Sequence, residues 1–82
     1  MRKSTNSRRK DLINLRAIGR RIRELRGFEV TQADFAHRIG VSQGYLSALE
    51  NGKKEPGAAV LLAIRKEFAM SVDWLLTGET QR

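Results

Sequence analysis

The stretch that most constrains this chain is TQADFAHRIGVSQGYLSALENG, which covers residues 31–52. Its first half has the pattern of a short helix that begins after Thr31. A threonine there accepts a hydrogen bond from a free amide of the first turn, and Asp34 three residues later resembles the second half of a capping box. Three apolar residues then recur at helical spacing and predict one buried face: Phe35, Ala36 and Ile39. Gly40 is expected to end this helix, because glycine adopts the left-handed cap conformation without strain.

A second short helix follows after only two residues. Val41 is apolar and can fill the turn, and Ser42 is a good N-cap. Leu46 and Leu49 are expected to face the core, while four small or polar residues face away from it: Gln43, Gly44, Ser47 and Ala48. Two helices this short and this close must cross steeply, which is the geometry of a helix-turn-helix. A helical hairpin without a role in DNA binding remains the alternative on this pattern alone.

Five residues at fixed spacing carry a family resemblance: Gln32, Ala36, Gly40, Leu46 and Leu49. The stretch resembles the helix-turn-helix of the lambda repressor/Cro-type (XRE) family, and the run LENGK at residues 49–53 is also typical of that family. The resemblance implies an all-α fold, a five-helix lambda-repressor-like DNA-binding domain with a flexible basic N-terminal arm. We expect the arm at residues 1–11, the domain at 12–78 and a tail at 79–82.

Length and composition restrict the other classes. An 82-residue chain has room for one small core. It has no cysteine and one histidine, and its pattern shows no paired carboxylates or phosphate loop, so we expect no enzyme, metal site or cofactor. No apolar run reaches the roughly 18 residues of a membrane span, and no apolar segment follows the basic N-terminus as in a secretory signal. We therefore expect a cytoplasmic protein without a membrane partner.

The net charge of +7 is unevenly distributed. Residues 1–27 hold ten basic and two acidic side chains, whereas the remainder holds six basic and seven acidic ones. Such a concentration suits a polyanion, and double-stranded DNA is the obvious partner. An anionic membrane would also attract it, but the arm has no apolar face to insert. Five basic residues form the predicted DNA arm: Arg2, Lys3, Arg8, Arg9 and Lys10. The alternative for the arm is a solvated tail.

Three further helices are predicted outside the central stretch. The first spans residues 12–26 and carries an apolar stripe of Leu15, Ile18, Ile22 and Leu25. The fourth spans residues 57–69, and the last spans 71–78 with Trp74 as a core anchor. Phe28 or Val30 is expected to close the core edge after the first helix. Apolar residues crowd the last helix, which predicts a dimer contact among Val72, Leu75 and Leu76.

The exposed face of the second helix of the motif is the predicted reading surface. A glutamine can pair with both N6 and N7 of adenine, and an alanine methyl can contact a thymine methyl. Four residues are predicted to read bases: Gln43, Gly44, Ser47 and Ala48. Gly44 departs from the family pattern and removes a side chain from this surface.

The resemblance also implies phosphate contacts and one structural ion pair. The predicted phosphate contacts are Gln32, Tyr45, Asn51, Lys53 and Lys54, with packing beside Leu49 as the alternative for Tyr45. Gln32 is further expected to brace Gln43. Arg26 and Glu50 are implied to form a partly buried bidentate pair.

These features together predict a transcriptional regulator. The favoured function is a dimeric repressor of phage or bacterial type, which reads a near-palindromic operator through the major groove. The alternative is an antitoxin, which binds a toxin protein and its own operator. A toxin or a polymerase is accordingly a candidate protein partner.

Overall fold

The computed structural model of the protein describes residues 13–79, and this range folds into helices joined by short loops. The helices of this range are α2 (Leu15–Arg26), α3 (Gln32–Ile39), α4 (Gln43–Glu50), α5 (Ala58–Phe68) and α6 (Val72–Thr77). No residue between 13 and 79 lies in a strand, so the all-α class is confirmed. The predicted arm at residues 1–11 and residues 80–82 of the tail lie outside the described range.

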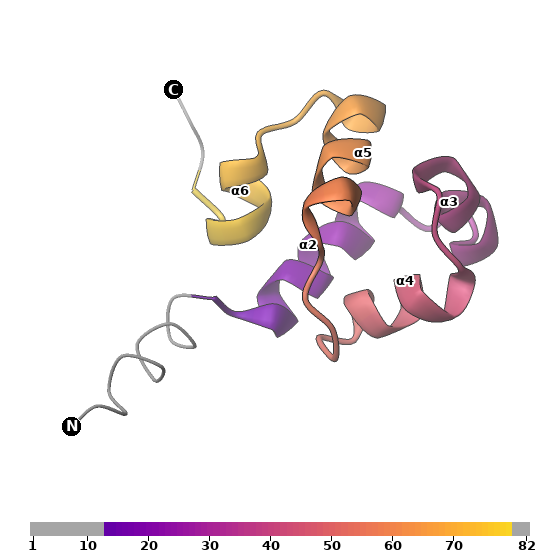
Figure 1. The fold of residues 1–82 in the computed structure, drawn as a ribbon, viewed down its shortest axis with the longest axis horizontal. Coiled ribbons are helices and arrows are strands. Elements are labelled where there is room, and N and C mark those ends of the chain that lie inside the picture. The colour runs from indigo at the N-terminus through magenta and orange to yellow at the C-terminus, as the bar shows by residue number, and fades with distance from the viewer. Residues whose placement is uncertain (1–12, 80–82) are drawn as a thin grey trace.

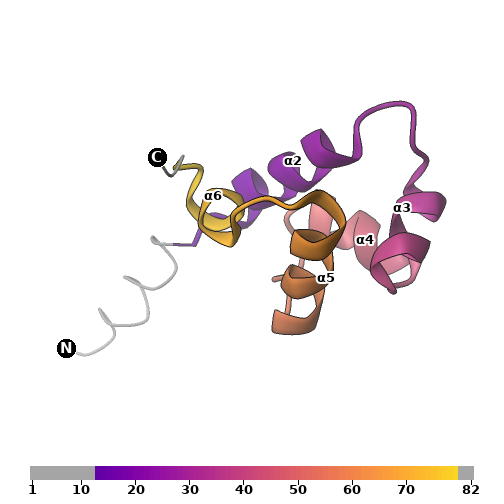
Figure 2. The ribbon, with the colours of Figure 1, turned by 90° about the horizontal axis from the view of Figure 1, so that it is seen from above.

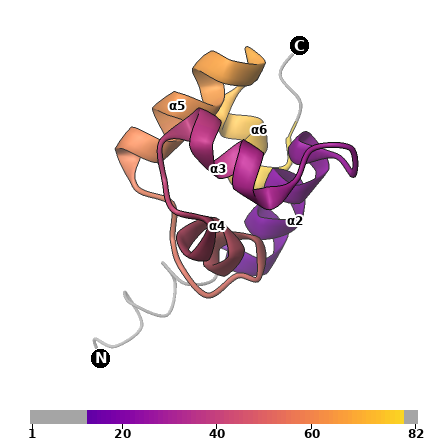
Figure 3. The ribbon, with the colours of Figure 1, turned by 90° about the vertical axis from the view of Figure 1, so that its right-hand side faces the viewer.

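Helix α2 runs through the middle of the domain, with α6 against one side and α4 against the other (Figure 1). Helix α3 packs on α4 and on α5. Seen from above, α6 lies at one end of the domain and α3 at the other (Figure 2). From the α3 end, α4 lies below α3 and beside α2, while α5 lies above α3 (Figure 3). The two helices of the predicted motif therefore occupy one corner, supported from behind by α2 and α5.

Nine buried side chains, contributed by all five described helices, form one core: Ile18, Ile22, Phe35, Ala36, Ile39, Leu46, Leu49, Ile64 and Leu75. The apolar faces predicted for the motif are among them. The ring of Phe68 stacks on that of Phe35, with 5.3 Å between ring centroids, and joins α5 to α3. Burial of each large side chain contributes about 1.5–3 kcal/mol relative to exposure.

Local capping chemistry sets the helix boundaries. The Oγ1 atom of Thr31 accepts from the amide of Asp34 at 3.0 Å, and the Oγ of Ser42 accepts from the amide of Tyr45 at 3.1 Å. The predicted start of α2 at residue 12 is wrong, because α2 begins at Leu15. The Oδ1 of Asn14 accepts from the amide of Ala17 at 3.0 Å and caps the helix there.

Helix α5 ends in an unusual cap. Ala69 adopts a left-handed conformation (φ 50°, ψ 43°), and its amide donates to the carbonyl of Arg65 at 2.7 Å. This conformation costs an L-residue about 1–2 kcal/mol, because its Cβ approaches the following carbonyl. The chain therefore carries local strain at the α5–α6 junction.

The last helix and the core edge settle two expectations. Leu75 is fully buried against α2, so its predicted role as a dimer contact is wrong. Leu75 is the only buried residue of α6. Its neighbours Trp74 and Leu76 are half-buried, and so is Val72 one turn earlier. Of the two residues expected to close the core edge after the first helix, Val30 packs against the core, whereas Phe28 is 98% exposed.

Candidate nucleic-acid interface

The outer face of α4 presents the residues predicted to read bases. Gln43 and Gly44 lie exposed in the first turn, and Ser47 and Ala48 lie half-buried one turn later. Residues four apart stack on one face of a helix, so these four residues share a surface. The Nδ2 of Asn51 donates a long hydrogen bond of 3.4 Å to the Oγ of Ser47 and extends this surface toward the end of α4.

The turn between α3 and α4 fixes the angle at which α4 is presented. Gly40 adopts a left-handed conformation (φ 77°), and its amide donates to the carbonyl of His37 at 3.2 Å. The amide of Val41 donates to the carbonyl of Ala36 at 2.9 Å, which completes a Schellman motif. Only a residue that tolerates positive φ fits this turn without strain.

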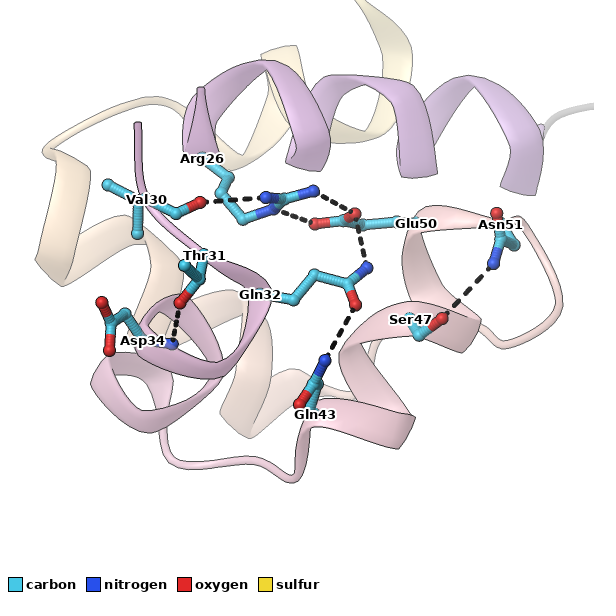
Figure 4. A network of polar contacts seen from close by, with 9 residues as sticks. All are labelled: Arg26, Val30, Thr31, Gln32, Asp34, Gln43, Ser47, Glu50 and Asn51. Atoms are coloured by element: carbon cyan, nitrogen blue, oxygen red, sulfur yellow. Dashed lines mark hydrogen bonds and ion pairs between the residues drawn. The ribbon is translucent and has the colours of Figure 1, made fainter. Parts of the chain in front are cut away.

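A polar network connects α2 to the first residue of α4 (Figure 4). The Nε and Nη2 atoms of Arg26 donate to the two carboxylate oxygens of Glu50, at 2.7 and 2.9 Å, and Nη1 donates to the carbonyl of Val30 at 2.9 Å. The Nε2 of Gln32 donates to Oε1 of Glu50 at 3.0 Å. The Nε2 of Gln43 in turn approaches Oε1 of Gln32 at 3.5 Å. The structure thus brings together four of the residues singled out from the sequence.

The electrostatics of this network favour the ionised pair. Burial alone would raise the pKa of Glu50, but hydrogen bonds from Arg26 and Gln32, with the charges of Arg26 and Arg23, outweigh burial and lower that pKa. The hydrogen bond to Glu50 raises the pKa of Arg26. Because the Glu50 side chain is only 3% exposed, removing its partner would leave an uncompensated buried charge, which typically costs about 3–5 kcal/mol.

The predicted phosphate contacts lie around both ends of α4. Lys53 and Lys54 are exposed in the loop after α4, and neither forms an ion pair within the described range 13–79. A second Schellman motif holds this loop, in which the amides of Gly52 and Lys53 donate to the carbonyls of Leu49 and Ala48 at 3.1 and 2.8 Å. The two lysines are therefore held beside the reading surface.

Tyr45 packs as its alternative role predicts, while its predicted phosphate contact stays a prediction. Its ring is half-buried and packs against the core, and its hydroxyl donates to the carbonyl of Glu55 at 3.4 Å. The long hydrogen bond leaves the hydroxyl at the surface of the loop that carries Lys54.

This arrangement of helices matches a known protein family. The pattern of the family described as "Helix-turn-helix domain" matches residues 19–80, which is most of the chain. The chain belongs to this family. Helices α3 and α4 are the two helices of the motif, and the helix-turn-helix fold predicted from the sequence is confirmed.

Relatives of this helix-turn-helix domain are regulators. The Propionyl-CoA carboxylase regulator of Cereibacter sphaeroides is 42% identical over 65 residues, which are 78% of this chain and 14% of that protein. Repressor protein C2 of Salmonella phage P22 is 35% identical over 68 residues, which are 82% of this chain and 32% of the repressor. The chain thus spans less than a third of the length of either curated relative.

Two solved structures share the fold. The P22 c2 repressor protein in complex with synthetic operator 9T superposes with a TM-score of 0.69 at 36% identity, over 76% of this chain and 96% of that one. The clp gene regulator ClgR from C. glutamicum gives a TM-score of 0.64 at 33% identity, over 77% of this chain and 83% of that one. In the described range of our helix-turn-helix protein, no helix is long and apolar enough to cross a membrane, and no acidic, histidine or cysteine cluster could hold a metal ion.

Two residues that hold α2 against its neighbouring helices could not be identified from the sequence. Gly19 lets α2 touch α4, because a Cβ there would stand 2.5 Å from the carbonyl oxygens of both Leu49 and Glu50. A glycine inside an otherwise strong helical pattern is the only signal for such a contact. The Nη1 of Arg21 donates to the carbonyl of Leu75 at 2.9 Å and joins α2 to α6, which no local pattern indicates.

Proposed function

We propose that this protein is a sequence-specific DNA-binding transcriptional regulator that acts as a dimeric repressor on a near-palindromic operator. Its family, the regulatory roles named for its relatives and the repressor–operator complex with the same fold support this proposal. Helix α4 enters the major groove with its N-terminal residues toward the base edges. A repressor of phage or bacterial type works in the cytoplasm, where its operator lies.

The observation that carries the proposal is the direction of the hydrogen bonds that lead to Gln43. A carboxylate only accepts, so Glu50 draws the amide nitrogen of Gln32 and turns the Gln32 oxygen outward. That oxygen accepts from Gln43, whose amide keeps one N–H and its oxygen free. A free donor and acceptor side by side match N7 and N6 of adenine in the major groove. Gln43 is thus preset to read adenine, with Gly44, Ser47 and Ala48 beside it.

Phosphate contacts supply most of the binding energy in this proposal. Lys53 and Lys54 neutralise phosphates beside the reading surface, with Asn51, Tyr45 and Gln32 as uncharged neighbours. The basic arm at residues 1–11, which lies outside the described range, adds further phosphate or minor-groove contacts. Each neutralised phosphate releases condensed counterions, so affinity falls steeply with salt.

Two copies are needed to read a palindrome. In the proposed dimer, the two α4 helices occupy successive major grooves about 34 Å apart. Val72 and Leu76, half-buried on the flanks of α6, are the remaining candidates for the contact between copies. Sedimentation that shows only monomers at tens of micromolar, both free and on DNA, would rule out this assembly.

Selection of bound sites from random DNA tests the reading function. The wild type should select half-sites related by a two-fold axis. Gln43→Ala should lose the preference at one adenine position, at a cost of about 1–3 kcal/mol, and keep its non-specific affinity. The double variant Lys53→Ala/Lys54→Ala is the matched control: it should weaken all sites equally and lower the slope of log affinity against log salt by about 2. If Gln43→Ala weakens all sequences equally, the proposed readout is wrong.

A further inference from the structure

A groove of 680 Å³ lies between α2 and α6, away from the reading surface. We call it the aromatic–arginine groove and define it by six of its lining residues: Arg20, Arg21, Arg23, Glu24, Phe28 and Trp74. Its volume falls within the range of about 300–1,000 Å³ that is typical of ligand sites. It is open rather than enclosed, which suits an extended or helical segment better than a small molecule.

The aromatic residues of the groove are unusually accessible. Phe28 is 98% exposed, although an aromatic ring of this size usually stabilises a core or an interface. It follows Gly27, whose positive φ of 72° turns the chain away from the core at the end of α2. Trp74 is half-buried, with one side against the core and another lining the groove. These two are the aromatic residues among those that line the groove, and they are its large apolar side chains.

The charged residues of the groove are mostly basic. Three arginines line it against one carboxylate, that of Glu24. Arg20 and Arg23 are exposed, and neither forms an ion pair with any residue between 13 and 79. Arg21 is held in place by its bond to the carbonyl of Leu75, so one guanidinium of the groove is fixed before any ligand arrives.

The groove lies on a different side of α2 from the motif. Arg20 and Glu24 follow one another at four-residue spacing on one face of α2, and Phe28 comes just after its C-cap Gly27. Gly19 and Arg26, which contact α4, lie on another face of α2. Arg23 lies at the border between the two faces, since its charge also acts on Glu50. Helix α2 thus separates α4 from α6 (Figure 1). The groove therefore stays accessible when α4 lies in the major groove of bound DNA.

We propose that the aromatic–arginine groove binds an acidic segment of a partner protein that carries at least one bulky apolar side chain. The apolar side chain packs between Phe28 and Trp74, and carboxylates on either side pair with Arg20 and Arg23. Arginine is suited to this role because its planar fork bonds carboxylates through two parallel hydrogen bonds. The excess of basic residues selects an acidic partner, whereas DNA alone would make no use of the two rings.

Selection from a random-sequence peptide display library on the immobilised full-length protein tests the proposal. Selected peptides should be enriched in Asp and Glu around one bulky apolar residue. Trp74 is the only tryptophan of the chain, so its emission reports occupancy directly when the peptides are synthesised without tryptophan. Phe28→Ser and Arg20→Glu should each weaken such a peptide by about tenfold or more, as expected for an interface anchor.

Matched control variants exist on α5. Leu62→Ser removes another exposed apolar side chain, and Arg65→Glu reverses another exposed arginine, in both cases outside the groove. Both should leave peptide affinity within about twofold of wild type, since distant sites act independently. Phe28→Ser should also leave DNA affinity unchanged, so failure of this proposal is distinguishable from failure of the proposed function.

Several results would overturn the proposal. One is a selection that yields no binder, or binders without acidic enrichment. Another is peptide binding that Phe28→Ser does not weaken. A Trp74 emission that shifts with protein concentration and depends on Phe28 would assign the groove to a second copy of this chain. A Phe28-dependent shift on adding duplex DNA would assign it to DNA.

Discussion

Substitution of Gly19 by alanine tests how closely α2 and α4 must approach. The added Cβ would stand 2.5 Å from two carbonyl oxygens, those of Leu49 and Glu50. The closest favourable C···O contacts are about 3.3 Å, so each contact falls short by about 0.8 Å. Both oxygens belong to backbone at the end of α4, and no side-chain rotation can relieve the clash. Helix α4 must therefore shift on α2.

The magnitude follows from two opposing terms. Overpacking of a filled contact costs about 1–3 kcal/mol, and a clash with backbone on two atoms belongs at the upper end, about 3 kcal/mol. Alanine gains about 1 kcal/mol over glycine inside a helix. We therefore expect Gly19→Ala to lower the free energy of unfolding by about 2 kcal/mol, the difference between these two terms.

Gly44→Ala is the matched control. Gly44 also lies in a helix, but a Cβ there would meet no atom within 4 Å. The free energy of unfolding of Gly44→Ala should rise by up to about 1 kcal/mol. Both variants have the same change in helix propensity, so their stabilities should differ by the clash alone, about 3 kcal/mol. Urea unfolding followed by far-ultraviolet circular dichroism measures both, and an unchanged m-value shows that the fold is retained. If Gly19→Ala is as stable as Gly44→Ala, the close approach of the two helices is not a constraint.

Three further predictions concern acid stability, strain and the arm. Because the pKa of Glu50 is lowered on folding, the stability from its ion pair is present above the unfolded pKa of about 4.3 and is lost as pH falls through the lower folded value. When the free energy of unfolding is measured at several pH values, wild type should lose stability toward acid, and Glu50→Gln, which is already destabilised at neutral pH, should lose less. Equal acid sensitivity of the two proteins would contradict this role of Glu50. Ala69→Gly should raise the free energy of unfolding by about 0.5–1 kcal/mol by relieving the left-handed alanine, whereas glycine at the exposed helical Ala59 should lower it by a similar amount. Deletion of residues 1–10 should reduce the salt dependence of DNA affinity, and an unchanged slope would refute the proposed arm contacts.

The sequence predicts the motif well because its boundaries depend on neighbours in the chain. Thr31 and Ser42 cap helices through amides three residues away, and Gly40 ends a helix through its own φ. The start of α2 is less predictable, since apolar residues continue before the helix and only the short-range bond of Asn14 decides where it begins.

Long-range packing explains what the sequence does not predict. Three consecutive apolar residues in α6 are equally good core candidates, and only the position of α6 on α2 selects Leu75 over Trp74. The outward direction of Phe28 likewise depends on how the loop returns from α2 to α3. The pairing of Arg26 with Glu50 is anticipated only through a family resemblance, because 24 residues separate them.

The polar network from Arg26 to Gln43 also limits how this domain can acquire a new DNA target. Gly44 is exposed with open space around it, so exchanging it changes the proposed reading surface alone, whereas Ser47 and Ala48 are half-buried and Ser47 also accepts a weak hydrogen bond from Asn51. Position 43 is different, because the buried carboxylate of Glu50 orients Gln32 as an acceptor toward it. A replacement that cannot donate a hydrogen bond leaves that acceptor to water, because this contact lies at the exposed surface. On the proposed reading surface, new specificity is therefore least constrained at position 44, while position 43 keeps its bond to Gln32 only with a side chain that donates a hydrogen bond.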